Sequence, residues 1–261
     1  MAEIIVENAG SITLLENFGS DLTVVNAARV SVDKRSAKMC AADAKLIRYL
    51  AEHDHISPFF HPQIRFRIKM PIFLAREWYR HTIGFARNEV SRRYVDSPPE
   101  FWMPSVFRER SPKLKQGSKE TEVENATELR AEYEKIVGLS ADFYAKMLRD
   151  NVAPEIARTI LPQGMYTEFI ETASLAAYAR LCKLRTGSDA QKEVRAYAQT
   201  ISDILGELYP VSWAALRTAP CAQALRTAPC AQAAQTRPTV NDTLDSGDVD
   251  LSGCVQSGQV D

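Results

Sequence analysis

Apolar residues recur at helical spacing in several separate stretches of the chain. Positions 42, 46, 47, 50 and 51 are apolar and share one face of a helix, so residues 41–53 are predicted to form an amphipathic helix. The same periodicity, combined with start and stop signals, predicts further helices over residues 22–30, 72–81, 121–151, 174–185 and 190–208. Asp21 is the candidate N-cap of the first of these, Gly138 a candidate break in the longest, and Pro210 the end of the last.

One stretch alternates strictly between apolar and basic residues and therefore predicts a strand. It covers residues 63–70, with apolar side chains at Ile64, Phe66, Ile68 and Met70 and basic ones at Arg65, Arg67 and Lys69. Successive side chains of a strand point to opposite faces, so this strand should be half-buried with one cationic face. Pro71 suits the first turn of the helix that follows, and residues 164–170 predict a second strand. The mixture predicts a helix-rich α+β fold.

The sequence changes character near residue 217. Residues 215–223 and 224–232 are two copies of one nonapeptide, and the segment after Thr236 has five aspartates against one arginine, a net charge of −4. Such a composition cannot bury enough apolar area to offset the entropy of the chain. We therefore expect one folded domain over residues 1–217 and a low-complexity, disordered tail over residues 218–261.

The overall composition excludes several broad classes of protein. With 261 residues, of which 45% are hydrophobic, the chain is long enough to bury a full core. A formal net charge of −1 argues against a protein that coats nucleic acid. No run of about eighteen apolar residues could span a membrane, and the start lacks the pattern of a secretory signal. The five cysteines are scattered without metal-ligand spacing, so we expect a cytoplasmic protein without a metal site.

Positive charge is concentrated in the middle of the chain. Residues 61–95 hold eight lysines and arginines against two acids, Glu77 and Glu89, which makes this segment +6 in a chain whose formal net charge is −1. Guanidinium groups match pairs of phosphate oxygens, so this concentration indicates a site for anionic groups. A solvated basic face is the alternative.

Residues 80–94 combine this charge with polar groups suited to a nucleotide. Gly84 permits a close approach or an unusual backbone dihedral angle. Asn88 and Glu89 could pair with the edge of a nucleobase or a flavin, and on the preceding helix Glu77 and Arg80 share a face. A phosphate clamp could come from the residues that follow, namely Ser91, Arg92 and Arg93.

Two arginines further along the chain are also candidates. Arg158 precedes the sequence Thr-Ile-Leu-Pro, and Arg185 ends a predicted helix. Ser174, Tyr178 and Leu181 lie on the same face of that helix as Arg185. Core packing is the alternative for the tyrosine and is preferred for the leucine.

Six stretches of the chain match, in order, the motifs of one known family. The first comprises residues 76–81 (Arg-Glu-Trp-Tyr-Arg-His) and 88–94 (Asn-Glu-Val-Ser-Arg-Arg-Tyr). The others are residues 26–31 (Asn-Ala-Ala-Arg-Val-Ser), 55–59 (His-Ile-Ser-Pro-Phe), 71–76 (Pro-Ile-Phe-Leu-Ala-Arg), 158–162 (Arg-Thr-Ile-Leu-Pro) and 184–193 (Leu-Arg-x4-Ala-Gln-x-Glu). Together they resemble the flavin-dependent thymidylate synthases, whose hallmark is Arg-His-Arg, then seven residues, then Ser. The resemblance covers roughly residues 10–217.

This resemblance implies a fold, an assembly and a reaction. The fold would contain a central, mainly antiparallel sheet, and the assembly would be a homotetramer with composite active sites. Each site would bind FAD and dUMP, take a methylene group from methylenetetrahydrofolate, and use FAD reduced by NADPH as the hydride source to make dTMP. The partners would be small molecules, with neither a membrane nor a nucleic acid expected.

By position, the resemblance also implies roles for individual residues. The dUMP site would be lined, partly from neighbouring subunits, by Glu77, Arg80, Glu89, Ser91, Arg92, Arg93, Arg158 and Arg185. The FAD site would include Ser31, Ser57, Arg80, His81, Arg87, Glu89, Ser174 and Arg180. Arg185 would be the catalytic residue, because a fixed cation beside uracil favours the ionised ring and pushes electron density toward the carbon that is alkylated.

The chain departs from the family pattern at a few positions. Thr82 occupies the third position of Arg-His-Arg, and Ser91 stands eleven residues after Arg80 where the family has ten. A one-residue insertion accounts for this spacing, and Arg87 is the candidate for the missing guanidinium. The other departures are Phe60, in place of an acidic residue, and Ser174 and Ala176, in place of Asn and Arg, for which Arg180 is the candidate replacement.

Two other interpretations fit parts of the sequence. Flavin-free thymidylate synthases need a cysteine nucleophile in the core, whereas the Pro-Cys pairs at 220–221 and 229–230 lie in the repeat, so that mechanism is rejected. A non-enzymatic protein that binds nucleotides or single-stranded nucleic acid could stack bases on Trp78, Tyr79, Phe85 and Tyr94. It would leave Glu77, Glu89 and the distant arginines without a role. The basic face of residues 65–69 could be solvated or could approach flavin phosphates.

Overall fold

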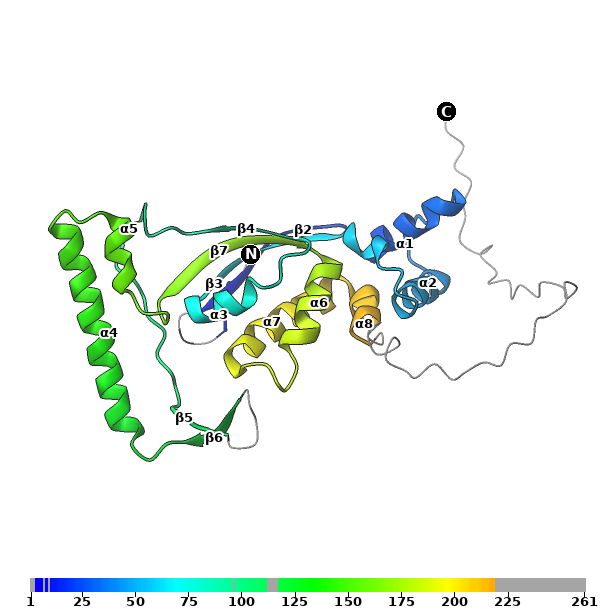
Figure 1. Ribbon diagram of the computed structural model, residues 1–261. Coiled ribbons are helices and arrows are strands. Elements are labelled where there is room, and N and C mark those ends of the chain that lie inside the picture. Colours follow the sequence, from blue (N-terminus) through cyan, green and yellow to red (C-terminus); the bar gives the residue numbers. More distant parts are fainter. Residues whose placement is uncertain (1–2, 7, 9, 96, 112–116, 219–261) are drawn as a thin grey trace, which may run out of the picture.

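The computed structural model describes residues 3–6, 8, 10–95, 97–111 and 117–218 of the chain. Its centre is a five-stranded sheet in which every neighbouring pair of strands is antiparallel (Figure 1). Across the sheet the strands are ordered β1 (Glu3–Ile5), β2 (Ser11–Phe18), β3 (Gln63–Pro71), β7 (Tyr166–Ser174) and β4 (Phe85–Glu89). Helices pack around this sheet, so the expected helix-rich α+β fold with a central antiparallel sheet is confirmed.

Two groups of helices accompany the sheet. The first packs on its apolar face and around one end, and comprises α1 (Asp21–Arg29), η1 (Val30–Val32), α2 (Ala41–Glu52), η2 (Ser57–Phe60), α3 (Ile72–Trp78), α6 (Leu175–Arg185), α7 (Lys192–Leu208) and α8 (Pro210–Thr218). The second comprises α4 (Ala126–Arg149), α5 (Pro154–Ala157) and η3 (Arg158–Ile160), and a hairpin of β5 (Arg108–Arg110) and β6 (Ser118–Glu122) leads into it. Figure 1 shows α4 standing apart from the sheet. No helix in the described part of the chain is both long and apolar enough to cross a membrane.

The alternation predicted for residues 63–70 is confirmed. The apolar side chains of β3 are fully buried, and α7 packs against this strand, where the Tyr197 hydroxyl donates to the Lys69 carbonyl at 2.9 Å. The basic side chains on the other face pair with acids of neighbouring segments: Arg65 with Glu16, Arg67 with Glu168, and Lys69 with Glu100. These ion pairs compensate the cationic face within the fold itself.

Some helix boundaries differ from the prediction for identifiable reasons. α1 begins at Asp21 because Ser20 is the N-cap, and the Ser20 N–H donates to Thr23 Oγ1 at 3.0 Å. α4 begins only at Ala126, because residues 118–122 pair with β5 as a strand. Gly138 lies inside α4 without breaking it. α3 ends at Trp78, three residues before the predicted end, so His81 lies beyond the helix.

α8 was not predicted, because Pro210 was interpreted as the end of the preceding helix. Proline is also favoured in the first turn of a helix, and α8 begins at this residue. The Asp21 carboxylate accepts hydrogen bonds from the backbone N–H groups of Val211 (3.0 Å) and Ser212 (2.8 Å) and so caps the new helix. α8 continues to Thr218, which was expected to be the first residue of a disordered tail over residues 218–261. The rest of that tail, residues 219–261, lies outside the described residues.

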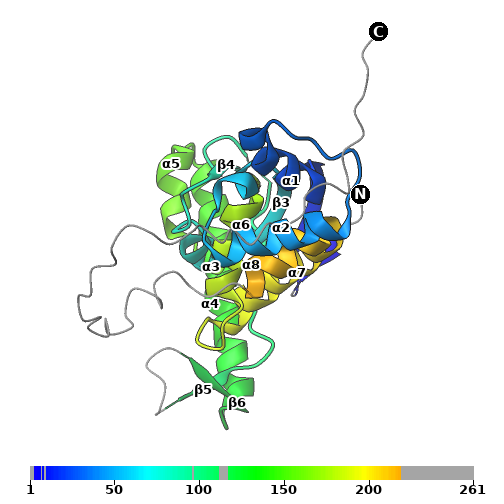
Figure 2. The same cartoon turned by 90° about the vertical axis from the view of Figure 1, so that its right-hand side faces the viewer.

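A buried ion pair joins α1 to α2. Arg29 and Asp43 are 4% and 0% exposed, and Arg29 Nη2 lies 2.6 Å from Asp43 Oδ1. The Ser36 hydroxyl and the Cys40 backbone N–H also donate to this carboxylate, both at 3.1 Å. The carboxylate is therefore well compensated, and it ties the loop between the two helices to both of them. Figure 2 shows α1 and α2 close to each other at this end of the molecule.

Candidate functional site

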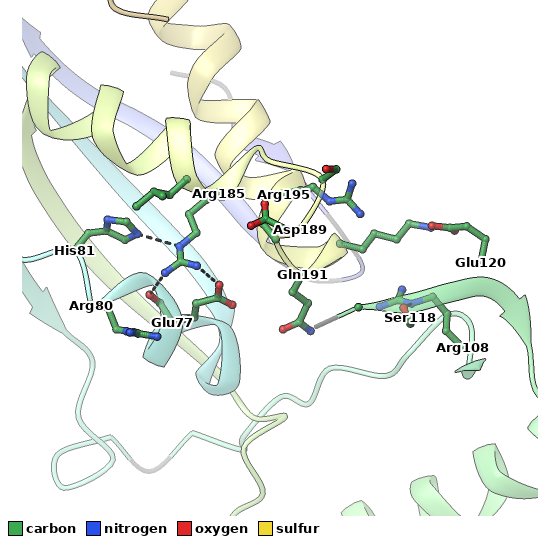
Figure 3. Close-up of a pocket in the computed structure, with 15 residues that line it drawn as sticks. Glu77, Arg80, His81, Arg108, Ser118, Glu120, Arg185, Asp189, Gln191 and Arg195 are labelled. Carbon is green, nitrogen blue, oxygen red and sulfur yellow. Dashed lines mark hydrogen bonds and ion pairs between the residues drawn. The ribbon is translucent and has the colours of Figure 1, made fainter. Parts of the chain in front are cut away.

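An open cleft with a volume of about 960 Å³ lies where the end of α3, the α6–α7 connection and the β5–β6 hairpin meet (Figure 3). The residues that line it include Glu77, Arg80, His81, Arg108, Ser118, Glu120, Arg185, Asp189, Lys192 and Arg195. Four of the residues expected in the site, Glu77, Arg80, His81 and Arg185, thus come together from α3, the segment after it, and α6. Arginines from several segments face one cavity, which suits a phosphorylated ligand.

Arg185 is held in place on the cleft wall by two neighbours. It is the last residue of α6, where a cation is favourable at the helix C-terminus. Its Nη1 donates to the Glu77 carboxylate, its Nη2 to the Glu77 carbonyl at 3.4 Å, and its Nε to His81 Nε2 at 3.0 Å. The side chains of Arg185 and Glu77 remain 16% and 24% exposed, so this fixed cation faces the cleft.

His81 is a neutral imidazole in this arrangement. A ring nitrogen that accepts a hydrogen bond carries no proton, so Nε2 is the acceptor and Nδ1 carries the hydrogen. The pKa of His81 is lowered to about 4, first because burial disfavours the charged ring and then because arginines surround it: Arg185, Arg87, Arg80 and Arg180. The site therefore presents a neutral ring beside a permanent cation.

Arg80 stands at the edge of the cleft with its side chain exposed. Figure 3 places it beside Glu77 and next to His81 in the chain. Its guanidinium donates to no other residue in the described part of the chain, which leaves its N–H groups available to a ligand in the cleft.

The opposite wall contains residues that the sequence did not single out. Arg108 of β5 donates to Glu193 at 2.6 Å, and Lys192 of α7 donates to Glu120 of β6 at 2.6 Å. These two ion pairs fasten the hairpin to the start of α7. The only sequence signal for this wall is the 184–193 motif, which contains Lys192 and Glu193; the polar hairpin has no hydrophobic periodicity that could have marked it.

A second group of expected residues lies around Arg180 of α6, beside the turn that follows His81. Arg180 Nη2 donates to the Ile83 carbonyl at 2.8 Å, and its guanidinium lies 5.8 Å from the centre of the Phe60 ring. Gly84 has φ +81° here, and a Cβ at this position would lie 3.1 Å from Ala177 Cβ. The turn after His81 can therefore approach α6 closely only because residue 84 is glycine.

The three serines expected at the FAD site lie on three different elements. Ser57 is exposed at the start of η2, which packs against α1 and α6. Ser174 is buried as the N-cap of α6, where its Oγ accepts from the Ala177 N–H at 3.2 Å. Ser31 lies in η1 and donates to the Ala28 carbonyl at 2.9 Å.

Arg87 and Glu89 lie on β4, a strand that the sequence did not predict. Arg87 points into the fold, where its Nε donates to the buried Glu171 carboxylate and its Nη1 to the His81 carbonyl at 2.6 Å. Glu89 accepts a hydrogen bond from Thr167 Oγ1 at 2.5 Å. Neither residue lines the cleft.

The remaining expected residues are not brought to the cleft within one chain. Arg92 donates to the Ser97 carbonyl, and the exposed Arg93 lies 5.4 Å from the centre of the Tyr94 ring. Ser91 precedes them on the same segment after β4 and accepts from the Arg93 N–H. Arg158 is exposed in η3, which packs against α4.

The described residues limit the chemistry that the cleft can perform with its own groups. They contain no cluster of three or more His, Cys, Asp or Glu side chains placed to hold a metal ion. Cys182 is fully buried, and burial raises the pKa of its thiol to about 12, so it is no nucleophile at neutral pH. What the cleft offers is a set of cations suited to an anion, one of them fixed in place, and a neutral imidazole.

Comparisons with known proteins agree on one family. Residues 13–211 match the family model described as thymidylate synthase complementing protein. The chain is 38% identical to the flavin-dependent thymidylate synthase of Thermus thermophilus over 210 residues, 80% of this chain and 76% of that relative. It is 36% identical to the protein of the same name from Thermosipho africanus over 207 residues, 79% of this chain and 90% of that relative.

A solved structure is similar as well. The UMP/dUMP methylase PolB from Streptomyces cacaoi, bound with 5-Br dUMP, matches with a TM-score of 0.73 and 27% sequence identity. The match covers 83% of this chain and 100% of that chain.

Proposed function

Because this chain belongs to the flavin-dependent thymidylate synthase family, we propose that its cleft is the place where dUMP is methylated to dTMP. Methylenetetrahydrofolate supplies the carbon, FAD supplies the hydride when bound, and we propose NADPH as the reductant. In the balanced reaction a methylene group moves from two folate nitrogens to uracil C5, where a hydride reduces it to methyl and the C5 proton leaves. The two nitrogens take up two protons, so that one proton is consumed net from solvent and tetrahydrofolate is released. A non-enzymatic nucleic-acid-binding protein is not favoured.

One observation carries this proposal: the Arg185 guanidinium is fixed at the cleft by Glu77 and His81. A uracil ring placed against this cation is favoured in the form that is ionised at its ring nitrogen, because an opposite charge within a few ångströms stabilises the anion. The negative charge of the ring is delocalised toward C5, the carbon that is alkylated. Because the His81 imidazole is neutral, it holds Arg185 in place without adding a second positive charge beside it.

The donor groups of the cleft and its surroundings fit a flavin nucleotide. Arg80 offers free guanidinium donors to a phosphate or to a carbonyl group of the flavin ring. The volume of about 960 Å³ is at the upper end of ordinary ligand pockets and suits two ligands lying side by side better than one. We propose flavin contacts by Ser31, Ser57, Arg80, His81, Glu89, Ser174 and Arg180, and dUMP contacts by Glu77, Arg80, Glu89, Ser91, Arg92, Arg93, Arg158 and Arg185.

We propose that each complete site is built from more than one subunit. Arg158 and Arg93 lie away from the cleft of their own chain, yet the resemblance assigns both to dUMP. The helix α4 supports an assembly, because Ile136, Leu139 and Phe143 lie on one of its faces and are 64%, 60% and 49% exposed. An apolar stripe of this kind is normally covered by a partner. A homotetramer of this chain would cover α4 and could bring both arginines to neighbouring clefts.

The proposed function is tested by mixing the purified protein with FAD, methylenetetrahydrofolate, NADPH and either dUMP or UMP. We expect the flavin absorption to change on adding dUMP, tritium to be released from 5-tritiated dUMP, and dTMP to form. UMP is included because the similar PolB is named for both nucleotides. The variant Arg65→Lys, which alters an exposed ion pair on the far face of the sheet, should behave like the parent protein in each of these assays. Failure of both nucleotides to release tritium would contradict the proposal.

We also propose that residues 219–261 are dispensable for this reaction. Trp213 and Leu216 of α8 are buried, so a truncation must follow Thr218 to leave the helix complete. A chain that ends at Thr218 should form dTMP at a rate within about twofold of the full chain. A truncation after Pro210 is the informative comparison, because it removes the buried side chains of α8 and should prevent folding.

A further inference from the structure

Glu171 is a carboxylate buried in the middle of the sheet, and the proposed reaction gives it no role. Its side chain is 0% exposed. Trp78 Nε1 donates to both of its oxygens at 3.2 and 3.3 Å, and Arg87 Nε donates to one of them. Arg87 stands directly opposite Glu171 in the pairing of β4 with β7. Burying such a charge is costly unless it is paired: burial raises the pKa of the Glu171 carboxyl, and Arg87 opposes that rise.

The same guanidinium reaches beyond the sheet. Arg87 Nη1 donates to the backbone carbonyl of His81 at 2.6 Å. The guanidinium lies 5.3 Å from the centre of the Tyr79 ring and 4.5 Å from that of Phe85, and the Arg87 side chain is only 14% exposed. Arg87 therefore joins the sheet to the segment between α3 and β4, which has no regular secondary structure to hold it.

From His81 the connection continues to the proposed catalytic group. The carbonyl of His81 is held by Arg87, and the ring of the same residue accepts from Arg185 Nε at 3.0 Å. A continuous set of contacts thus runs from Glu171 through Arg87 and His81 to the Arg185 guanidinium. Each link is a charge-assisted hydrogen bond or an ion pair, and these have stricter geometry than apolar contacts.

We propose that Arg87 is a positioning residue, which holds His81, and through it Arg185, in the place that the proposed reaction needs. Arg87 does not line the cleft, and two of its three nitrogens are committed to Glu171 and to the His81 carbonyl. It therefore acts through protein groups and does not replace, as a ligand contact, the arginine missing at Thr82. This inference rests on the proposed function of the cleft.

Arg87→Lys separates the two tasks of the guanidinium. A lysine keeps a positive charge for Glu171, but its single ammonium cannot also reach the His81 carbonyl on the far side. We expect the melting temperature to change by only a few degrees, kcat for dTMP formation to fall at least about tenfold, and KM for dUMP to stay within about threefold. We also expect the pKa of His81, about 4 in the parent protein, to rise toward 6.5 as the ring leaves the arginines.

The pKa of His81 is followed by NMR of histidine-labelled protein, with His81→Gln to assign the signal. This measurement needs no turnover, so the positioning role can fail while the proposed function survives, and the reverse. Arg65→Lys is the control, because Arg65 also forms a cross-strand ion pair with a glutamate but lies on the exposed face of the sheet. It should leave kcat and the pKa of His81 unchanged.

One further variant decides the outcome if Arg87→Lys disturbs the fold. The double variant Arg87→Met with Glu171→Gln removes both charges and keeps an acceptor for Trp78. It should fold, show the same fall in kcat for dTMP formation, and show the same rise in the pKa of His81. Unchanged kcat and an unchanged His81 pKa in a folded variant would overturn the proposal. Adding Thr82→Arg to Arg87→Lys should not restore kcat; full recovery would show that Arg87 contacts a ligand after all.

Discussion

Arg185 Nε donates to His81 Nε2 across 3.0 Å, a contact that the imidazole can accept only in its neutral form. A protonated ring has no acceptor and would place a second positive charge against the arginine. The pKa of His81 is accordingly lowered from 6.5 to about 4, by burial and by the arginines Arg185, Arg87, Arg80 and Arg180; Glu77 is the acid of the same cluster. The contact is thus sensitive to pH in a defined direction.

The first prediction concerns stability at low pH. Above pH 6.5 His81 is neutral in both folded and unfolded chains, so its contribution to the free energy of unfolding is fully present. As the pH falls from 6.5 to about 4, the unfolded chain takes up the proton and the folded chain resists it, so this contribution is lost progressively. Chemical denaturation of the protein and of His81→Gln between about pH 7.5 and about pH 4.5 measures the effect.

The difference in free energy of unfolding between the parent protein and His81→Gln reports on His81, because His53, His55 and His61 are present in both. The amount by which the free energy of unfolding of the parent protein exceeds that of His81→Gln should decrease as the pH falls. A difference that stays constant, or grows, across this range would show that the imidazole is not held neutral by its surroundings.

The second prediction concerns the role of Arg185 in the reaction. Arg185→Ala should lower kcat for dTMP formation by about 10²–10³-fold, the usual cost of removing one group that stabilises developing charge. Flavin retention should weaken much less, because Arg80 and Arg180 keep their positions. Single-turnover kinetics and the flavin content of the purified variant provide the two measurements. An equal loss of both would assign Arg185 to flavin binding alone.

The third prediction concerns the buried ion pair between α1 and α2. Asp43→Asn removes the charge partner of Arg29, which is 4% exposed, and should lower the free energy of unfolding by about 3–5 kcal/mol. Glu16→Gln is the matched control, since it breaks a pair with Arg65 whose members are 69% and 46% exposed. The control should cost no more than about 1 kcal/mol. Urea titrations of the two variants compare these costs directly.

The fourth prediction compares two glycines whose substitution by alanine should have opposite signs. Gly84 has φ +81°, and its new Cβ would meet Ala177 Cβ at 3.1 Å, so Gly84→Ala should destabilise the protein by about 1–2 kcal/mol. Gly138 is exposed inside α4 with nothing within 4 Å of an added Cβ, so Gly138→Ala should stabilise by about 0.5–1 kcal/mol. Thermal unfolding of both variants tests the pair; equal shifts would contradict the backbone argument at Gly84.

Strong periodicity explains which elements could be predicted from the sequence. β3 shows a clear alternation of apolar and basic residues, and α2 shows a clear apolar stripe. The bounds of both elements were predicted to within one residue. β4 was not, because Arg87, Asn88 and Glu89 are polar in succession, and the strand exists only through its pairing with β7. Pairing partners of this kind are distant in sequence, so local patterns do not reveal them.

The site shows the same division between local and long-range information. Glu77, Arg80 and His81 lie within five positions of one another, and a motif could mark them together. Glu171 is separated from Arg87 by 84 positions, and the residues next to it in β7 are apolar or small. The sequence offered Arg87 as a ligand contact, and it could not reveal the carboxylate that engages this guanidinium.

The hydrogen bonds from Val211 and Ser212 to Asp21 have a consequence for how the protein is made. The carboxylate that caps α8 is synthesised 190 positions before the first of the amides that it binds, and α2 must also wait for α8 to cover it. The emerging polypeptide cannot complete this end of the molecule until nearly the whole folded region has left the ribosome. Its early helices therefore spend most of translation without their final partner, and this is when a chaperone would have most to protect.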